Sequence, residues 1–275
     1  MIPKIIHYNW FGGKPQTQLV EKCVQSWREY LPDYEIICWN EDNFKLEDHC
    51  IYVREAYRQG NFAFVSDYVQ AWALHEYGGV YIDSDVEVRK NLDHFLQHRA
   101  FIGFQETEFP FTALWGCEKG HEFAFLLRKE YEQFEKFAPV INTILVTRLL
   151  VDHFKVNPDA DIFQELPHGL MLYPSHYFCV DMRYYDDFNH HYACHHFNSS
   201  WIDKDNKPAP NFYKEFVFKK YMLRTIAKTG NIEITLNNVV NNVDNDLLLT
   251  RIGNKKILSH LIKSLFGLNP KAGGI

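Results

Sequence analysis

The sequence predicts an α/β domain with a mixed, mostly parallel β-sheet. Segments with the apolar spacing of helices alternate with short segments rich in β-branched and aromatic residues, the order found when helices cover a parallel sheet. The 275 residues are 46% hydrophobic, which is enough for a sizeable core. Acidic residues also follow one of the strands, at the edge of the sheet where α/β proteins bind their ligands.

The first half of the chain contains three predicted strands and three predicted helices. The strand segments are rich in Ile, Val, Tyr and Trp, which favour a pleated surface. We expect strands over residues 4–8, 34–40 and 80–88. The helical segments carry apolar residues three or four positions apart, and the last of them has Asn61 at its start and Gly78 at its end. We expect helices over residues 18–31, 44–58 and 61–78.

The second half continues this alternation and then changes character. We expect strands over residues 99–105 and 169–178, helices over residues 122–137 and 141–154, and a last extended segment over residues 192–201. We expect one α/β domain over residues 1–228 and a helical C-terminal extension over residues 229–275. Paired apolar residues recur every four positions in this extension, so its helix either docks on the domain or lies on an anionic membrane surface.

Composition and charge exclude several classes of protein. The formal net charge of −6 argues against a general nucleic-acid-binding protein. The six cysteines are scattered without a C-x-x-C pair, which predicts reduced thiols in a cytosolic protein. We expect neither a signal peptide nor a membrane-spanning helix, because no segment is sufficiently long and apolar. The motifs of P-loop enzymes, dinucleotide-binding folds and α/β-hydrolases are missing from the sequence.

The acids Asp83, Asp85 and Glu87 stand at alternate positions of the segment "VYIDSDVEV". On a continuous strand they would share one face, where their like charges repel each other. Two arrangements make this tolerable: a strand end open to solvent, or a cation between the carboxylates. Carboxylate oxygens suit Mg²⁺ and Mn²⁺, so the second arrangement predicts a metal site.

A second polar pair stands on the helix that precedes these acids. Asp67 and Gln70 lie three residues apart and therefore on neighbouring positions of one helix face. Only Gly78 and Gly79 separate the helix from the acidic strand, so we expect the helix to be held close to that strand. A solvated or capping role remains the alternative for Asp67.

Four segments together carry a resemblance to a known family. In chain order they read "IPKIIHYNWFGG", "SWREYLPDYEIICWNEDN", "FVSDYVQAWALHEYGGVYIDSDVEV" and "HHFNSSW". This series resembles the D-x-D glycosyltransferases of family 32, which include bacterial capsule and O-antigen transferases and the yeast initiating mannosyltransferase. The catalytic domains of the clostridial glucosylating toxins are more distantly similar. The resemblance covers about residues 2–205 and is more specific than a lone D-x-D.

The resemblance implies a metal-dependent, retaining glycosyltransferase with a GT-A-like fold. Its cofactor would be Mn²⁺ or Mg²⁺, and its donor a nucleotide sugar such as a UDP-sugar or GDP-mannose. The acceptor would be a polysaccharide, another glycan or a lipid-linked oligosaccharide, as in capsule biosynthesis. We expect a cytoplasmic protein, with the C-terminal helix offering a peripheral contact to the inner face of the membrane.

The resemblance also assigns roles to individual residues. The catalytic acids would be Asp67, Asp83 and Asp85, of which Asp67 holds sugar hydroxyls and Asp83 contacts ribose or sugar. The metal ligands would be Asp83, Asp85, His196 and Ser199. The donor would further contact Trp10, Ser66, Gln70, Ser199, Ser200 and Trp201, with Trp10 stacking on the base and Trp201 closing over the diphosphate.

Some of these positions have a structural alternative. Trp10 and the serines at 199 and 200 could instead serve the core and a turn, respectively. His195 and His196 are adjacent, so in an extended segment only one of them can face a metal, and we assign His196. Gln70 stands where the family usually has Arg, and a neutral amide binds hydroxyl groups without neutralising charge.

Two other functions compete with the glycosyltransferase. One is a metal-dependent phosphatase that uses a D-x-D nucleophile pair, although only Val86 fits the usual pattern of such enzymes. The other is a catalytically inactive module that binds sugar nucleotides or glycans, which the glutamine at position 70 makes conceivable. Hydrolysis of nucleotide sugars compared with hydrolysis of a phosphomonoester separates them.

Overall fold

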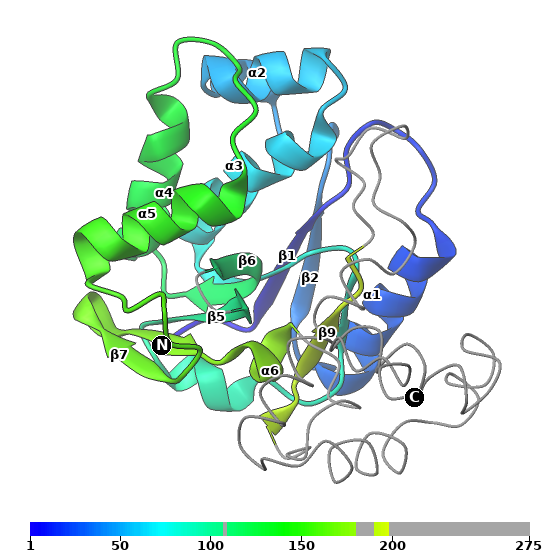
Figure 1. The fold of residues 1–275 in the computed structure, drawn as a ribbon. Coiled ribbons are helices and arrows are strands. Elements are labelled where there is room, and N and C mark those ends of the chain that lie inside the picture. Colours follow the sequence, from blue (N-terminus) through cyan, green and yellow to red (C-terminus); the bar gives the residue numbers. More distant parts are fainter. Residues whose placement is uncertain (107–108, 180–189, 198–275) are drawn as a thin grey trace, which may run out of the picture. The chain divides into compact units, whose positions relative to one another are not determined.

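A mixed β-sheet with helices on both faces forms the part of the chain that the structure describes, which is residues 1–106, 109–179 and 190–197 of a computed structural model (Figure 1). Seven strands of these residues lie in the order β2-β1-β3-β6-β5-β8-β7, and β4 pairs with β9 in a separate ribbon. The strands are β1 (Ile5–Asn9), β2 (Glu35–Trp39), β3 (Gly79–Ile82), β4 (Val86–Val88), β5 (Ala100–Glu106), β6 (Phe109–Cys117), β7 (Gln164–Leu166), β8 (Leu170–Tyr173) and β9 (Ala193–His195).

Most strands of the larger sheet run in the same direction. Strands β1, β2, β3, β5 and β8 share one direction, while β6 and β7 run against them. This confirms the predicted α/β class with a mixed, mostly parallel sheet. In the described part of the chain the helices are α1 (Gln18–Tyr30), α2 (Ile51–Arg58), α3 (Phe62–Tyr77), α4 (Glu122–Glu132), α5 (Asn142–Phe154) and α6 (Ser175–Phe178), with three short 3₁₀ helices between them.

The predicted elements agree best where the apolar periodicity is long. Strands β1, β2 and β5 and helices α1, α3 and α5 lie where we expect them. The helix predicted over residues 44–58 is shorter and begins at Ile51, and the strand predicted over residues 169–178 ends at Tyr173, where α6 follows. Strands β6 and β7 were not predicted. Eight of the nine residues of β6 are buried, so the strand lacks the polar alternation by which a half-exposed strand is identified.

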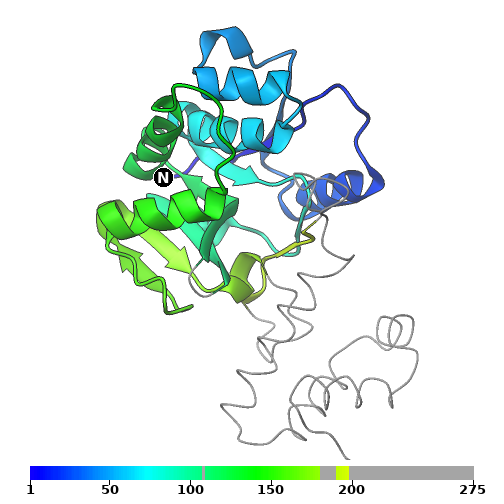
Figure 2. The ribbon, with the colours of Figure 1, turned by 45° about the horizontal axis from the view of Figure 1, so that its top comes forward.

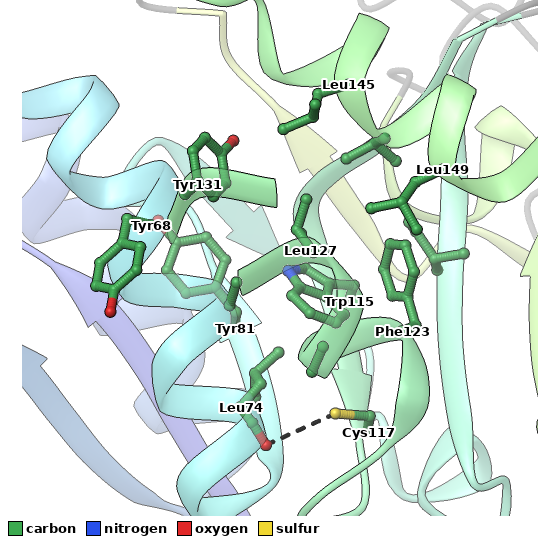
Figure 3. Packing of buried hydrophobic residues seen from close by; sticks show 14 of the residues in the cluster. Tyr68, Leu74, Tyr81, Trp115, Cys117, Phe123, Leu127, Tyr131, Leu145 and Leu149 are labelled. Atoms are coloured by element: carbon green, nitrogen blue, oxygen red, sulfur yellow. Dashed lines mark hydrogen bonds between the residues drawn. The ribbon is translucent and has the colours of Figure 1, made fainter. Parts of the chain in front are cut away.

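The two faces of the sheet carry separate hydrophobic clusters because side chains alternate along each strand. In β3, Val80 and Ile82 join the cluster beneath α1, while Tyr81 joins the one beneath α2 to α5. Figures 1 and 2 show α2, α3, α4 and α5 on one face and α1 on the other. Figure 3 shows Tyr81 and Trp115 among the residues of the larger cluster. Helix α3 and Tyr81 are therefore on the same side of the sheet.

The link between α3 and β3 needs glycine for steric reasons. Gly79 has a φ of +113°, and a β-carbon built on it would lie 2.6 Å from the carbonyl oxygen of Ile5 and 3.0 Å from Nε2 of His7. Any side chain at this position would therefore push β3 away from β1. Because β3 pairs directly with β1 in parallel, the acids that follow β3 lie beside the carboxyl end of β1.

A fully buried histidine fastens the same link. His7 in β1 donates from Nε2 to the carbonyl oxygen of Gly78 at 2.8 Å, and its Nδ1 accepts from Nε1 of Trp39 at 3.1 Å. This pair of bonds requires a neutral ring with its proton on Nε2. Burial lowers the pKa of His7 to about 4, although the bond to Gly78 acts in the opposite direction.

We expect His7 to make the fold acid-sensitive. The unfolded chain binds the His7 proton at a higher pH than the folded one, so stability falls as the pH drops from 6.5 towards 4. Between pH 7.5 and pH 5 this single group should lower the free energy of unfolding by roughly 2 kcal/mol. Urea unfolding at both pH values, with wild type compared with His7→Gln, measures the contribution. An equal loss in both proteins would show that His7 does not cause it.

Among the described residues, no helix is long and apolar enough to cross a lipid bilayer. None of the six cysteines, all of which lie in the described residues, forms a disulfide. The domain boundary at residue 228, the extension over residues 229–275 and its amphipathic helix lie outside the described residues, so these predictions are not tested.

Candidate active site

The two aspartates of the D-x-D motif lie in a turn beyond the carboxyl end of β3. The chain leaves β3 at Ile82, turns through Asp83 to Asp85 and enters β4 at Val86. The prediction of one strand over residues 80–88 is therefore wrong, because β3 and β4 belong to different sheets. The amide of Val86 donates to the carbonyl oxygen of Asp83 at 2.9 Å and closes the turn. The turn places both aspartates in one cluster, whereas a continuous strand would set them in a row along one face.

Asp83 is held by neighbouring backbone and side-chain groups. Its amide donates to the carbonyl oxygen of Ala113 at 2.7 Å, and its Oδ1 accepts from the hydroxyl of Tyr81 at 2.7 Å. Burial, followed by the charge of Asp85, raises the pKa of Asp83 above its ordinary value, while His195 and Tyr81 oppose this increase. A carboxylate in these surroundings favours a nearby positive charge.

His195 from β9 completes a cluster with the two aspartates. One ligand atom from each of Asp83, Asp85 and His195 lies within 4.8 Å of the others, and His195 Nε2 is 3.2 Å from Asp85 Oδ1. Burial acts to lower the pKa of His195, but the charges of Asp85 and Asp83 outweigh it and raise the pKa above its ordinary value. Two carboxylates and an imidazole form a donor set that fits Mn²⁺, and water and phosphate oxygens can complete its shell.

The structure brings His195, and not the predicted His196, to the aspartates. Strand β9 pairs antiparallel with β4 and sets His195 opposite Val86, so the next side chain points elsewhere. The ring of His196 lies 2.9 Å from a carboxylate oxygen of Glu87, while its amide donates to the carbonyl oxygen of Asp85 at 3.0 Å. One histidine of the pair thus lies beside the aspartates, while the other contacts Glu87.

Glu87 belongs to an ion-pair group instead of the cluster. Besides His196, it contacts Lys22 at 3.0 Å and Arg89 at 3.7 Å. The hydrogen bond from His196 is the main reason that the pKa of Glu87 falls to about 2, against the effect of burial. The third acid of the opening motif is therefore a salt-bridge partner on the other side of β4.

Asp67 in α3 is bonded to a residue that the sequence does not single out. Its Oδ1 accepts from Nδ2 of Asn142, the first residue of α5, at 2.6 Å, and from Nε2 of Gln70 at 3.4 Å. The contact with Gln70 agrees with their predicted positions on one helix face. Burial raises the pKa of Asp67 to about 7, and the bond from Asn142 opposes this increase. Asp67 therefore changes its protonation state near neutral pH.

Gln70 lies behind Asp67, where it is 2% exposed. Its Oε1 accepts from Nε1 of Trp115 at 2.8 Å, while its Nε2 faces Asp67. An arginine in this buried position would set its own N–H donors against the indole N–H of Trp115, which can only donate. The glutamine and Trp115 thus form a matched pair, and the structure places Gln70 as a support of Asp67.

Trp10 stands directly after β1 in a loop with several anchors. It is partly exposed, and its Nε1 donates to the carbonyl oxygen of Lys14 at 2.6 Å. Glu41 accepts from the amide of Gly12 at 2.6 Å and from the hydroxyl of Tyr57 at 2.8 Å. These contacts fix the loop at the carboxyl edge of the sheet with one part of the indole accessible, which a stacking platform requires.

The remaining predicted residues fall into two groups. Ser66 precedes Asp67, and its hydroxyl donates to the carbonyl oxygen of Phe62 at 3.1 Å within α3. The predicted donor and metal contacts Ser199, Ser200 and Trp201 lie outside the described residues, so their placement is not tested.

The sequence contains weak signals for the site residues that were missed. His195 reaches the aspartates through the pairing of β9 with β4, and two adjacent histidines do not reveal the register of that pairing. Asn142 follows the apolar Ile141 in the first turn of a predicted helix, where nothing in the local pattern distinguishes it. Tyr81 has the pattern of an ordinary strand aromatic.

Comparison with known proteins identifies the region that contains the motif. Residues 17–102 match the family described as "Glycosyltransferase sugar-binding region containing DXD motif". This segment includes α3, β3 and both aspartates of the turn. The resemblance to D-x-D glycosyltransferases that the sequence motifs predict is therefore confirmed for this region.

Two curated relatives come from Schizosaccharomyces pombe. "Inositol phosphoceramide mannosyltransferase 3" is 27% identical over 139 residues, which is 48% of this chain and 38% of the relative. "Inositol phosphoceramide mannosyltransferase 2" is 25% identical over 213 residues, 74% of this chain and 59% of the relative. This chain thus spans only part of each relative. Among solved structures, "PaToxG Glycosyltransferase" covers 55% of this chain and 68% of its own, with 17% identity and a TM-score of 0.42.

Proposed function

We propose that this chain, whose residues 17–102 match the family of D-x-D glycosyltransferases, transfers a sugar from a nucleotide-sugar donor to a glycan or lipid acceptor. The observation that carries the proposal is the cluster of Asp83, Asp85 and His195 beyond the carboxyl end of β3. Acidic and imidazole ligands at this edge of an α/β sheet suit the diphosphate of such a donor, held through a divalent cation.

In this proposal the cluster binds Mn²⁺ or Mg²⁺, and the imidazole favours Mn²⁺. The bound cation would supply charge stabilisation for the diphosphate that leaves the sugar. His195 must lose its proton to become a ligand, so the proton and the metal compete for the same nitrogen. Because Asp85 and Asp83 raise the pKa of His195, we expect metal affinity to increase with pH.

The remaining residues would orient the donor. Asp67 accepts hydrogen bonds from sugar hydroxyls, while Asn142 and Gln70 hold its carboxylate in place. Trp10 provides the surface on which the nucleotide base stacks. Catalysis then rests on orientation and electrostatic stabilisation, and we assign no nucleophile to the chain. Transfer with retention at the anomeric carbon belongs to the proposal through the family resemblance.

We propose a mannosyl donor, with GDP-mannose ahead of UDP-sugars. The support is that the curated relatives are named as mannosyltransferases. Their names also specify inositol phosphoceramide, so a membrane-anchored glycolipid is the acceptor class that we favour over a free polysaccharide. Cytoplasmic placement with a peripheral membrane contact through the C-terminal extension remains part of this proposal.

The proposal is tested by incubating the protein with GDP-mannose, UDP-glucose and UDP-N-acetylglucosamine, with and without Mn²⁺. We expect Mn²⁺-dependent release of the nucleoside diphosphate from one donor, stimulated by a lipid-linked acceptor, and a product with the donor's anomeric configuration by NMR. Release of phosphate from p-nitrophenyl phosphate would favour the phosphatase instead. Tight donor binding without turnover would favour the inactive module, and absence of both binding and turnover would contradict the proposal.

A further inference from the structure

Asn9 occupies the last position of β1, between the two elements that carry the acidic residues of the site. It is 6% exposed, and its Nδ2 donates to the carbonyl oxygen of Ser66 at 3.1 Å and to the hydroxyl of Tyr81 at 3.3 Å. Ser66 is the neighbour of Asp67 in α3, and the Tyr81 hydroxyl itself donates to Asp83. One amide group therefore links the backbone beside Asp67 to the side chain of Asp83.

The orientation of this amide follows from its partners. The carbonyl oxygen of Ser66 can only accept a hydrogen bond, so the nitrogen of the Asn9 amide must face it. The hydroxyl of Tyr81 uses its own proton on Asp83 and therefore accepts from Asn9. Exchanging the oxygen and nitrogen of the amide would set two acceptors against each other. The chain Asn9 to Tyr81 to Asp83 thus has a single direction of donation.

The side-chain oxygen of Asn9 gains nothing from this arrangement of hydrogen bonds. This atom, Oδ1, is buried and has no hydrogen-bond partner among the residues that the structure describes. A buried carbonyl oxygen without a partner carries its full desolvation penalty. An apolar side chain of similar shape avoids that penalty, so the fold by itself gains little from an amide here. The Ser66 carbonyl lies inside α3, where the helix supplies an amide of its own.

We propose that Asn9 is a positioning residue that sets the separation between Asp67 and Asp83 at the expense of stability. This inference rests on the proposed glycosyltransferase function and adds a residue to its site. Asp67 would contact the sugar, and Asp83 the cation near the diphosphate. The distance between these groups must match one donor, and reacting groups tolerate little displacement. Asn9 joins the two through hydrogen bonds, which add to the packing of Tyr81 with α3 in one hydrophobic cluster and to the Gly78–Gly79 link.

The test uses Asn9→Leu in the full-length protein, with kcat and KM for the donor, Mn²⁺ affinity and melting temperature measured together. We expect kcat and Mn²⁺ affinity to fall by roughly 10- to 100-fold, the usual effect of removing a partner behind a metal ligand. The melting temperature should stay within about 3 °C of wild type. If leucine prevents folding, Asn9→Ala replaces it and the expected losses of kcat and affinity are the same.

A double-mutant cycle shows whether Asn9 acts through Tyr81. If it does, Asn9→Leu combined with Tyr81→Phe should weaken Mn²⁺ binding no more than the more damaging single change. The matched control is His121→Leu: this side chain is 1% exposed and accepts from the amide of Phe123 at the start of α4. We expect that variant to lower the melting temperature while kcat and Mn²⁺ affinity remain unchanged.

The possible outcomes distinguish a failure of the role given to Asn9 from a failure of the proposed glycosyltransferase function. A wild-type protein that binds Mn²⁺ but turns over no nucleotide sugar contradicts the function, whereas the Mn²⁺ affinities still test Asn9. The inference is overturned if Asn9→Leu keeps the wild-type kcat and Mn²⁺ affinity. It is equally overturned if the variant loses stability as His121→Leu does, without a change in either quantity. Additive losses in the double mutant would exclude action through Tyr81.

Discussion

Replacing Asp85 with Asn is expected to abolish Mn²⁺-dependent donor turnover while the protein remains folded. The change removes a charged ligand from the cluster with Asp83 and His195 but keeps the shape of the side chain. Because altering a residue behind a metal ligand already costs about 10- to 100-fold, loss of the ligand itself should cost at least ~100-fold. Calorimetry measures Mn²⁺ affinity directly, and nucleoside diphosphate release measures turnover.

The folded state of Asp85→Asn can be followed without relying on activity. In wild type, saturating Mn²⁺ should raise the melting temperature, since a ligand present at 100 times its dissociation constant stabilises by about 2.7 kcal/mol. The variant should not respond to the ion. Asp48→Asn is the matched control, because this exposed aspartate lies in a 3₁₀ helix and should leave the response intact. Wild-type Mn²⁺ affinity in folded Asp85→Asn would eliminate Asp85 as a ligand.

Replacing Asp67 with Asn is expected to lower activity and raise stability. An ionised carboxylate accepts stronger hydrogen bonds from sugar hydroxyls than an amide does. Since bonds to charged groups are worth about 1.5–3 kcal/mol, kcat/KM should fall by roughly 10- to 100-fold. The variant can still accept from Asn142, so the change mainly removes charge. Steady-state kinetics from pH 5 to pH 9 measure the effect, after correction for metal occupancy at each pH.

The loss of activity and the gain of stability in Asp67→Asn should both depend on pH. Burial raises the pKa of Asp67 to about 7, so wild-type kcat/KM should increase as the pH rises through 7, and this increase should be absent in Asp67→Asn. The raised pKa also means that the ionised carboxylate opposes folding increasingly as the pH rises. Relief of this penalty should stabilise the variant more at pH 8 than at pH 5, by roughly 2.5 kcal/mol.

A second aspartate distinguishes this effect from general charge removal. Asp152 is exposed on α5, the helix that also supplies Asn142. Asp152→Asn should change neither the pH profile nor the difference in stability between pH 5 and pH 8. Our assignment of Asp67 fails if its variant retains the wild-type profile, or if its free energy of unfolding decreases at pH 8.

Local spacing was enough to predict most of the elements that carry the site. The two glycines at 78 and 79 indicated that α3 ends directly before β3, and their backbone angles and close contacts agree. The separation of three residues between Asp67 and Gln70 predicted a shared helix face, on which they are hydrogen bonded. Such features depend on the chain over a few residues, where the geometry of helices and strands is regular.

The strand β6 shows where this reasoning fails within the fold. It lies between β3 and β5 in the sheet, and it supplies Ala113, whose carbonyl oxygen accepts the amide of Asp83. Its residues are nearly all buried, so no alternation of polar and apolar side chains distinguishes it. Burial on both faces is a property of the assembled layers, and neither face can be recognised before the sheet exists.

The sequence by itself determined the α/β class, the D-x-D motif and the helix that presents Asp67. Only the tertiary structure decided that His195 joins the aspartates, because antiparallel pairing of β9 with β4 sets which of two adjacent histidines faces them. It also brought Asn142 to Asp67, across 75 positions of sequence. Contacts of this kind depend on the register and packing of distant segments, whereas local periodicity specifies only the face of its own element.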